Sequence, residues 1–564
     1  EKAARLRPEI EQIMIAGPED GSEESRTAFE KDLYILRRRI EKKVIEAQIQ
    51  GFYICSLSCR SIIYKGLFLA ESLSVFYPDL NDSRFESRVA IYHQRYSTNT
   101  FPQWWLAQPF RCLAHNGEIN TIRGNTNWMK SHEIKMAATA FGAHSEDIKP
   151  LIPAGSSDTA ALDAVFEAIV RSGRDAPTAK TMLVPEAWAK DADMPPAHKA
   201  MYAYFASVME PWDGPAALAM TDGRWAVAGL DRNALRPMRY TQTADGLLVV
   251  GSESGMVFLN EETIVAKGRL GPGEMIAVDL MDGQLYRDRA LKDRIAAAAP
   301  YDRWAGAFRT IADLPAPRAV PALPTGAQLR RLQTAAGLSM EDMELILAPM
   351  VEDAKEAVGS MGDDTPLAVI SKNARSMSHF FRQNFSQVTN PPIDSLRESR
   401  VMSLKTRFGN HGNILDSDEP QQGVMVLESP LLLSDEWHRL KAHFGDQAAE
   451  IDCTFDYDAG PDGLKAAIAR IRSEAEAAVR QGKGQLFLTD EHQSATRCAV
   501  TMILAAAGVH THLVRKGLRT FASINVRSAE CLDVHYFAVL IGVGATTVNA
   551  YLAQESIIDR HARG

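Results

Sequence analysis

The stretch AALAMTDGRWAVAGLD, residues 216–231, sets the local fold of the region around it. Two apolar runs of similar length flank Asp222-Gly223, and Asp-Gly is a pair that favours the tight turn of a β-hairpin. We therefore predict two antiparallel strands here, joined at this pair. Further β-type runs at 247–252 and 275–286 continue the pattern along the chain.

Apolar runs broken by turns also precede this hairpin. Those that we expect to form strands lie at 52–57, 61–70, 88–97 and 111–120. Helices are predicted at 29–45 and 159–173, where apolar residues recur at three- and four-residue spacing. Groups of strands separated by helices predict a layered α+β domain, in which helices cover sheets.

The second half of the chain changes to a regular alternation of strands and helices. Strands are expected at 423–433, 450–457, 485–490 and 537–541, with helices such as 463–482 between them. This alternation predicts an α/β domain with a parallel sheet. The Ala- and Pro-rich stretch 290–326 separates the two patterns, and we interpret it as an interdomain connector.

Composition excludes several classes of function. A length of 564 residues predicts about two to four domains, and 46% apolar with 24% charged residues is typical of globular proteins. The net charge of −9, without a basic run, argues against nucleic acid or an anionic membrane as the main partner. The longest uncharged stretch, 536–554, is interrupted by Gly and polar residues, so no membrane span is predicted.

Two further details concern the origin of the chain. Six scattered cysteines are too few for a disulfide framework and indicate a reducing compartment. The first residue is Glu1 rather than Met, and nothing near it resembles a signal peptide. We therefore expect the chain to begin inside a longer product, or after the processing of one.

The motif HNGEIN, residues 115–120, allows two interpretations. Asn116-Gly117 matches the commonest two-residue hairpin turn, which is the more frequent structural use of this pair. Alternatively, the Asn116 amide and the Gly117 backbone N–H can converge on an oxygen that becomes negative during acyl transfer. The residue types alone leave both interpretations open.

Two further motifs offer charged groups that can bind a substrate. In HQRYSTNTFPQW (93–104), Arg95 can hold a carboxylate through two hydrogen bonds, unless it pairs with a nearby acid on the surface. In GSSDTAALDAVF (155–166), Asp158 is an acceptor for an ammonium group, although the same segment can simply cap the helix that follows. Together the motifs offer a group that binds a carboxylate, a group that accepts from an ammonium group, and two donors to an oxyanion. This combination suits a free α-amino acid whose side-chain acyl group is attacked.

A nucleophile for such an attack is missing from these motifs. His93 and His115 lie near these motifs, but no Ser or Cys lies in a G-x-S-x-G elbow. Cys112 lies inside an apolar strand pattern, which is typical of a core residue.

Long runs of the sequence resemble a single family. YHQRYSTNTFPQWWLAQPFRCLAHNGEINTIRGNTNWM (92–129), followed by GSSDTAALD and MEPWDGPAALAMTDG, is similar to the glutamine amidotransferase domain of the glutamate synthase large-subunit family. The later runs 360–371, 380–410 and 525–556 resemble the central domain of that family. One departure is Ala234, in LDRNALRP, where the family is expected to have Gly.

The resemblance covers essentially the whole chain and implies an internal portion of such a large subunit. It predicts an amidotransferase domain at 1–289 that lacks its N-terminal start, a connector at 290–326 and a central domain at 327–564. The implied fold is an α+β, layered domain of the N-terminal-nucleophile hydrolase type, followed by an α/β central domain.

The resemblance also implies roles for single residues. In this family an N-terminal Cys attacks the side-chain amide of glutamine, and its own α-amine acts as the base. That Cys is not in this chain, which starts at Glu1. Carried over by motif, Arg95 would hold the carboxylate of glutamine and Asp158 its amino group, while Asn116 and Gly117 would form the oxyanion hole.

The family's whole enzyme carries FMN and a [3Fe-4S] cluster, and no residue of this chain is expected to bind either cofactor or a metal. Ammonia from glutamine would be channelled to 2-oxoglutarate and reduced to glutamate at the downstream FMN site. Electrons would come from NADPH through a small iron–sulfur flavoprotein subunit, or from ferredoxin. The resemblance further implies an oligomer in the cytoplasm, or in a plastid if the chain comes from a plant.

Two other functions compete with this one. Without the nucleophile and the cofactor site, the chain would be a catalytically silent scaffold or interaction fragment. It would alternatively be an amidotransferase that feeds a different synthase, which the central-domain resemblance disfavours. A glutaminase assay separates the enzyme from the scaffold.

Overall fold

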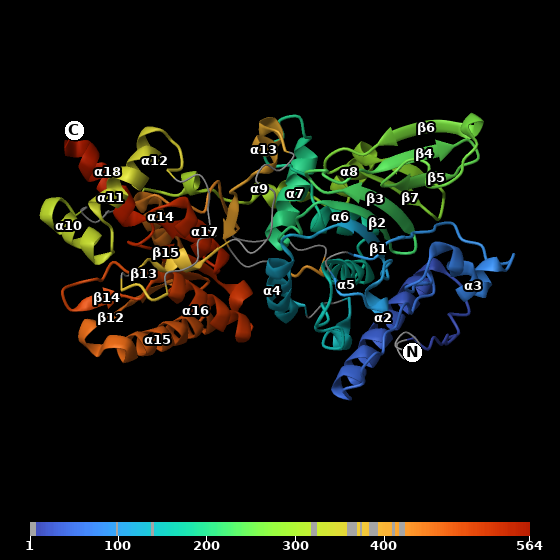
Figure 1. Cartoon of the computed structure of the whole chain (residues 1–564), viewed down its shortest axis with the longest axis horizontal. Coiled ribbons are helices and arrows are strands. Elements are labelled where there is room, and N and C mark those ends of the chain that lie inside the picture. Colours follow the sequence, from blue (N-terminus) through green and yellow to red (C-terminus); the bar gives the residue numbers. More distant parts are fainter. Residues whose placement is uncertain are drawn as a thin grey trace.

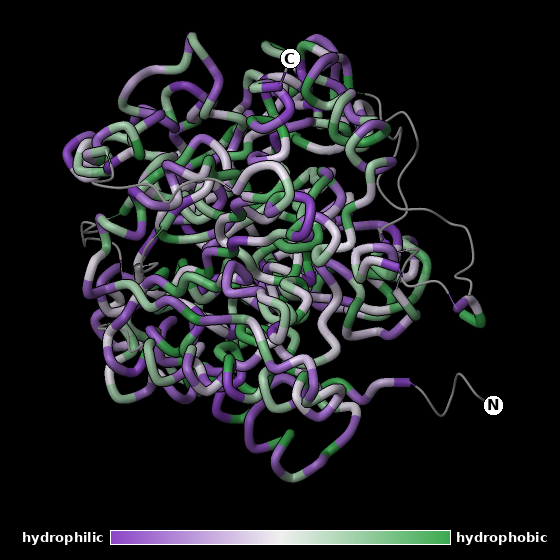
Figure 2. The backbone as a smooth tube through the Cα atoms, turned by 90° about the vertical axis from the view of Figure 1, so that its left-hand side faces the viewer, coloured by the Kyte–Doolittle hydropathy of each residue, from purple (hydrophilic) through white to green (hydrophobic). Residues whose placement is uncertain are grey.

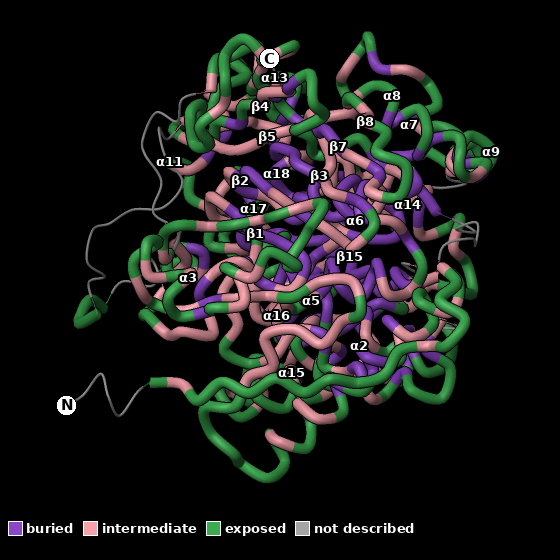
Figure 3. The backbone as a smooth tube through the Cα atoms, turned by 90° about the vertical axis from the view of Figure 1, so that its right-hand side faces the viewer, coloured by how far each residue is buried: buried purple, intermediate pink, exposed green. Residues whose placement is uncertain are grey.

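The computed structural model describes residues 7–97, 100–136, 140–316, 324–357, 369–372, 375–382, 393–408, 412–416 and 424–563. Figure 1 shows two lobes: an N-terminal lobe, residues 7–316, and a C-terminal lobe, formed mainly by residues 324–357 and 424–563. Hydrophobic and hydrophilic residues alternate over short distances along the backbone in Figure 2, and the buried segments gather in the interior in Figure 3. No described helix is both long and apolar enough to cross a membrane.

The N-terminal lobe contains two antiparallel sheets. The larger has the order β1-β2-β3-β7-β8, with β1 Leu113–Gly117, β2 Ala216–Thr221, β3 Trp225–Leu230, β7 Met275–Asp279 and β8 Leu285–Arg287. The smaller has the order β5-β4-β6, with β4 Arg239–Thr243, β5 Leu248–Gly251 and β6 Ile264–Arg269. The predicted hairpin is confirmed, because β2 and β3 pair around Gly223, whose φ of +89° suits glycine.

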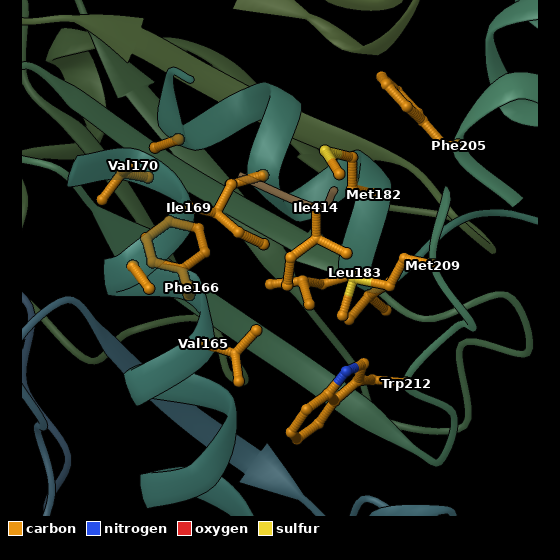
Figure 4. Packing of buried hydrophobic residues seen from close by; sticks show 14 of the residues in the cluster. Val165, Phe166, Ile169, Val170, Met182, Leu183, Phe205, Met209, Trp212 and Ile414 are labelled. Carbon is orange, nitrogen blue, oxygen red and sulfur yellow. The ribbon is translucent and has the colours of Figure 1, made fainter. Parts of the chain in front are cut away.

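The helices of this lobe supply most of its core. They are α2 Glu23–Glu46, α4 Ile122–His132, α5 Asp158–Arg171, α6 Ala176–Leu183, α7 Pro196–Val208, α8 Asp288–Ala296 and α9 Tyr301–Gly306. The helices predicted at 29–45 and 159–173 are confirmed by α2 and α5. Figure 4 shows Val165, Phe166 and Ile169 of α5 packed beside Leu183 of α6 and Trp212, all in one buried cluster.

Three of the predicted strands are wrong. Residues 52–57, 61–70 and 88–97 form irregular structure, and within the described part of the chain no strand pairs with them. A strand needs a neighbour that exchanges backbone hydrogen bonds with it, and an apolar run does not by itself provide one. Of the predicted run 111–120 only β1 is a strand, at the edge of the larger sheet.

The predicted connector is helical at its start. Most of α8 and all of α9 lie within 290–326, and their residues Leu291, Ile295 and Trp304 belong to the core of the N-terminal lobe. Ala-rich sequence also favours helix, and the four-residue spacing of Leu291 and Ile295 gives α8 a buried face. Residues 290–306 therefore pack mainly as helices of the N-terminal lobe, and the domain boundary stays a prediction.

The C-terminal lobe is built on a parallel sheet, as the alternation of elements predicts. Its order is β11-β13-β15-β16, with β11 Ala448–Asp452, β13 Gln485–Thr489, β15 Ser523–Arg527 and β16 Thr547–Asn549. The main helices of the lobe are α10 Gly326–Ala335, α14 Ser434–Phe444, α15 Gly460–Arg480, α16 Met502–Arg515, α17 Val534–Gly542 and α18 Tyr551–Arg563.

One predicted strand of this lobe is a helix. Residues 537–541 lie within α17, whose N-cap Asp533 accepts a hydrogen bond from Tyr536 N at 2.8 Å. A short apolar run fits a strand and a buried helix equally well, so its periodicity could not separate the two. The capping Asp533 was the local signal that favoured the helix.

The two lobes touch through α4 and the turn that follows α16. Lys135 Nζ donates to Thr520 O at 3.1 Å and lies 4.6 Å from the ring centre of Phe521. The Arg519 guanidinium stacks over Trp128 at 5.0 Å. A short segment, 393–408, crosses back to the N-terminal lobe, where α13 (Ser395–Val401) lies near α7 in Figure 1.

Candidate active site

Asn116 and Gly117 lie in a strand rather than in a turn. In the β1–β2 ladder Asn116 is opposite Ala217 and Gly117 is opposite Ala216. The hairpin-turn interpretation of this pair is therefore wrong, because a residue in a ladder with a distant strand cannot also form a two-residue turn.

Gly117 occupies a position that only glycine fits. Its φ is +149°, and a Cβ placed there would lie 1.7 Å from Pro215 O. The next residue continues the close approach, since Glu118 N donates to the same carbonyl at 3.0 Å. Gly214 has φ +154°, and a Cβ there would lie 2.0 Å from Glu118 O. Two glycines thus let the end of β1 pack directly against the segment that enters β2.

Asp158 stands next to this strand end. Its Oδ2 accepts from Ile119 N at 3.0 Å, and its Oδ1 accepts from Thr159 N at 2.7 Å. The N-cap of α5 is Ser157, whose Oγ accepts from Ala160 N at 3.2 Å. Because Ser157 takes the capping role, the Asp158 carboxylate is available to hold the loop after Gly117 and to face a positive group.

His115, one residue before Asn116, is buried and neutral at physiological pH. Its Nδ1 lies 3.1 Å from Thr159 Oγ1, next to Asp158. Burial lowers the pKa of His115 to about 4, and the nearby Asp158 carboxylate only partly opposes this shift. His115 therefore adds no positive charge next to the Asp158 carboxylate.

Two residues that the sequence analysis did not single out hold β1 in place. Gln108 accepts from His115 N at 2.6 Å and donates to His115 O at 2.9 Å, so its amide acts as a partner for the open edge of β1. Asp163 of α5 accepts from the backbone amides of Cys112, at 2.8 Å, and Leu113, at 3.1 Å. In the sequence, Asp163 falls on the apolar side of the predicted helix 159–173. A carboxylate in that position must find hydrogen-bond donors when it is buried, and this could have drawn attention to Asp163.

Arg95 lies in the irregular segment that precedes β1. Its side chain is exposed, and its backbone N donates to His93 Nδ1 at 3.3 Å. Among the described residues no ion pair joins its guanidinium to an acid. Residues 98–99 of the same motif lie outside the described part of the chain.

Ala234 adopts the conformation that explains why Gly is expected there. Its φ is +50°, in the left-handed region that a Cβ disfavours. The turn is anchored by Asp231, which accepts from Asn233 N at 2.8 Å and from Ala216 N at 3.0 Å. The departure from the family pattern thus places a strained residue beside the start of β2.

Burial raises the thiol pKa of each of the six cysteines. Cys112, Cys453 and Cys531 are buried, and burial raises the pKa of each thiol well above its usual value. Cys59 is exposed, but partial burial and the Glu30 carboxylate raise its pKa to about 11. In the part of the chain that the structure describes, no group of three or more His, Cys, Asp or Glu residues is placed to hold a metal ion.

Comparison with known proteins identifies the family. The model of class-II glutamine amidotransferases matches residues 1–304, which is more than half of the chain. The chain belongs to the class II glutamine amidotransferases. A second model, the glutamate synthase central domain, matches residues 331–564. The two matches follow the order that the sequence resemblance predicts.

Relatives with curated descriptions are glutamate synthases. The chain is 62% identical to the glutamate synthase [NADPH] large chain of Azospirillum brasilense, over 100% of this chain and 37% of that protein. It is 39% identical to the corresponding large chain of Bacillus subtilis, over 98% of this chain and 36% of the relative. It is 41% identical to the chloroplastic ferredoxin-dependent glutamate synthase of Spinacia oleracea, over 98% of this chain and 34% of the relative. The chain thus spans about a third of the length of these relatives.

Proposed function

We propose that this amidotransferase lobe hydrolyses glutamine to glutamate and ammonia, as part of a glutamate synthase large subunit. The observation that carries the proposal is the end of β1 at Asn116-Gly117, because the Asp158 carboxylate holds the loop that follows through Ile119 N. The β1–β2 ladder fixes the backbone of both Asn116 and Gly117, and donors fixed in this way stabilise a developing negative charge without rearranging.

The proposed roles follow from the chemistry of each group. The family's N-terminal Cys thiolate adds to the amide carbon of glutamine, and the carbonyl oxygen becomes an oxyanion. The Asn116 amide and the Gly117 N–H donate hydrogen bonds to that oxygen. Asp158 pairs with the α-ammonium group and Arg95 with the α-carboxylate, which aligns the side chain for attack.

At the level of the fold, we infer an N-terminal-nucleophile hydrolase arrangement for the first domain. Its two antiparallel sheets, with α5 against β1 and α6 against β3, support this. The predicted division into 1–289, 290–326 and 327–564 is kept as a proposal, with the first domain extended to Gly306. The six-residue helix α9 supports the extension, because Trp304 packs in the core of the N-terminal lobe.

For the whole protein, we propose that the ammonia reaches 2-oxoglutarate and is reduced to glutamate with FMN and an iron–sulfur cluster. NADPH or ferredoxin would supply the electrons, as the names of the relatives indicate for those proteins. No described residue is assigned to either cofactor. The proposed location is the cytoplasm, or a plastid for a plant protein.

The test is the replacement Asn116→Ala in the full-length enzyme. Loss of one oxyanion donor is expected to lower the glutaminase kcat roughly a hundredfold or more. Asn127→Ala, which changes an exposed amide on α4, serves as the matched control and should leave kcat unchanged. An unchanged kcat in Asn116→Ala would remove the oxyanion role of Asn116.

A further inference from the structure

A cavity of about 180 Å³ lies between α6–α7 of the N-terminal lobe and the crossing segment 393–408. Tyr202, Phe205, Met209 and Trp212 are apolar residues that line it. Figure 4 shows Phe205, Met209 and Trp212 among the packed residues of the core. A cavity of about 150 Å³ is enough to hold a benzene molecule. The space therefore suits a single small organic molecule.

Six charged side chains also line this cavity: Glu186, Asp213, Arg232, Arg400, Lys405 and Arg407. Most are neutralised within the protein. Asp213 pairs with Arg232 at 2.8 Å across the cavity wall. Glu186 pairs with Lys292, also at 2.8 Å, and accepts from the Tyr202 hydroxyl at 2.9 Å.

The two cations nearest to Arg407 along the chain are neutralised as well. Arg400 pairs with Asp191 of the N-terminal lobe. Lys405 pairs with Glu428 at 2.9 Å. Each of these charges is compensated without a ligand, so the charge balance of the cavity depends on Arg407.

Arg407, in the three-residue strand β9 (Thr406–Phe408), has no such partner. Among the described residues no acid pairs with its guanidinium, and its Nε is buried without a hydrogen-bond partner. Burial alone lowers the pKa of Arg407 to about 10, and no neighbouring charge contributes to the shift. Its guanidinium lies 5.7 Å from the ring centre of Trp188, which also lines the cavity. A cation held in this way is costly unless an anion completes the site.

We propose that this cavity binds a small organic monocarboxylate, with its carboxylate on Arg407 and its apolar body against the aromatic wall. A planar guanidinium matches a carboxylate through two parallel hydrogen bonds. One uncompensated positive charge calls for one negative charge. A dianion such as phosphate would bring a second negative charge into a cavity that Glu186 and Asp213 also line.

The experiment uses the full-length enzyme and benzoate as the probe, with binding followed by isothermal titration or saturation-transfer NMR. Benzamide has the same shape without the charge, so it should bind at least about tenfold more weakly. Arg407→Gln should weaken benzoate at least about tenfold, whereas Lys405→Gln, which changes a paired cation of the same cavity, should not. Inorganic phosphate should not compete.

Several results would overturn the assignment. They are equal binding of benzamide and benzoate, unchanged binding by Arg407→Gln, an equal loss in Lys405→Gln, and competition by phosphate. If Arg407→Gln does not fold, Arg407→Lys is the second variant. It keeps the positive charge but cannot form the two parallel hydrogen bonds of a guanidinium, so weaker benzoate binding is expected. Full affinity for benzoate in Arg407→Lys would contradict the proposed pair of hydrogen bonds. These experiments measure benzoate binding and not glutaminase activity. A negative binding result therefore leaves the proposed function unaffected, and a loss of the proposed function leaves the cavity assignment unaffected.

Discussion

Asp158→Asn is the substitution that most directly separates a substrate contact from a structural role. The change keeps the size of the side chain and removes its charge. The two Asp158 oxygens accept from Ile119 N and Thr159 N, and Asn has only one oxygen with which to accept. We expect the free energy of unfolding to fall by about 1–2 kcal/mol, because one backbone amide loses its partner.

The effect on catalysis should be larger and of a different kind. A charge-assisted hydrogen bond to the ammonium group of glutamine is worth about 1.5–3 kcal/mol. Its loss should raise the KM for glutamine roughly 10- to 100-fold, since each 1.4 kcal/mol is about tenfold in affinity. The kcat should change less, because the ammonium group lies away from the amide that reacts.

The assay is steady-state release of glutamate from glutamine by the full-length enzyme, with denaturant unfolding of the same samples. Ser157→Ala is the control, because it removes the N-cap bond to Ala160 and costs about 1 kcal/mol without a change of charge. Its KM should stay within about twofold of the wild type. The reasoning is refuted if Ser157→Ala raises KM as much as Asp158→Asn, or if Asp158→Asn leaves KM unchanged.

Three further outcomes are expected. Arg95→Ala should raise the KM for glutamine about tenfold or more with a smaller change in kcat, and a loss of stability without a KM change would contradict the carboxylate role. Ala234→Gly should raise the free energy of unfolding by about 0.5–1 kcal/mol in denaturant titrations, because relief of the positive φ outweighs the added chain entropy; a lower stability would show that the turn is not strained. Burial raises the pKa of Asp490 to about 7, so the folded state keeps a proton that the unfolded state loses near pH 4. Stability should therefore fall as the pH rises from about 4 to 7, and Asp490→Asn should flatten this slope; an unchanged slope would mean that Asp490 does not carry it.

Short-range sequence patterns correctly predicted the strands and helices that are set by residues close together in the sequence. The hairpin around Gly223 and helix α5 follow from a turn pair and from apolar spacing, both of which act within a few residues. The parallel sheet of the C-terminal lobe follows from the alternation of elements. By contrast, the run 88–97 has apolar character but no partner strand among the described residues, and 537–541 lies in a helix that Asp533 caps. Apolar content marks burial and does not specify the hydrogen-bond partner.

For the candidate site too, the sequence indicated some features, and others depend on contacts between distant segments. Residue types and motif resemblance singled out Arg95, Asn116, Gly117 and Asp158 before any geometry was known. The sequence could not show that the Asn116-Gly117 pair lies in a strand, because that depends on a ladder with a segment far along the chain. It also could not identify Gln108 as the partner of the open edge of β1, since isolated amides carry no periodic signal.

The sequence by itself determined the family, the order of the two domains and the chemical groups available to a glutamine site. Only the tertiary structure decided how those groups are used. It assigned the helix cap to Ser157 and thereby left Asp158 to hold the loop after Gly117. It also neutralised the charges around one cavity while leaving Arg407 without an acid among the described residues. The physical reason is that pairing and burial depend on contacts between residues distant in sequence, and these form only when the whole core packs.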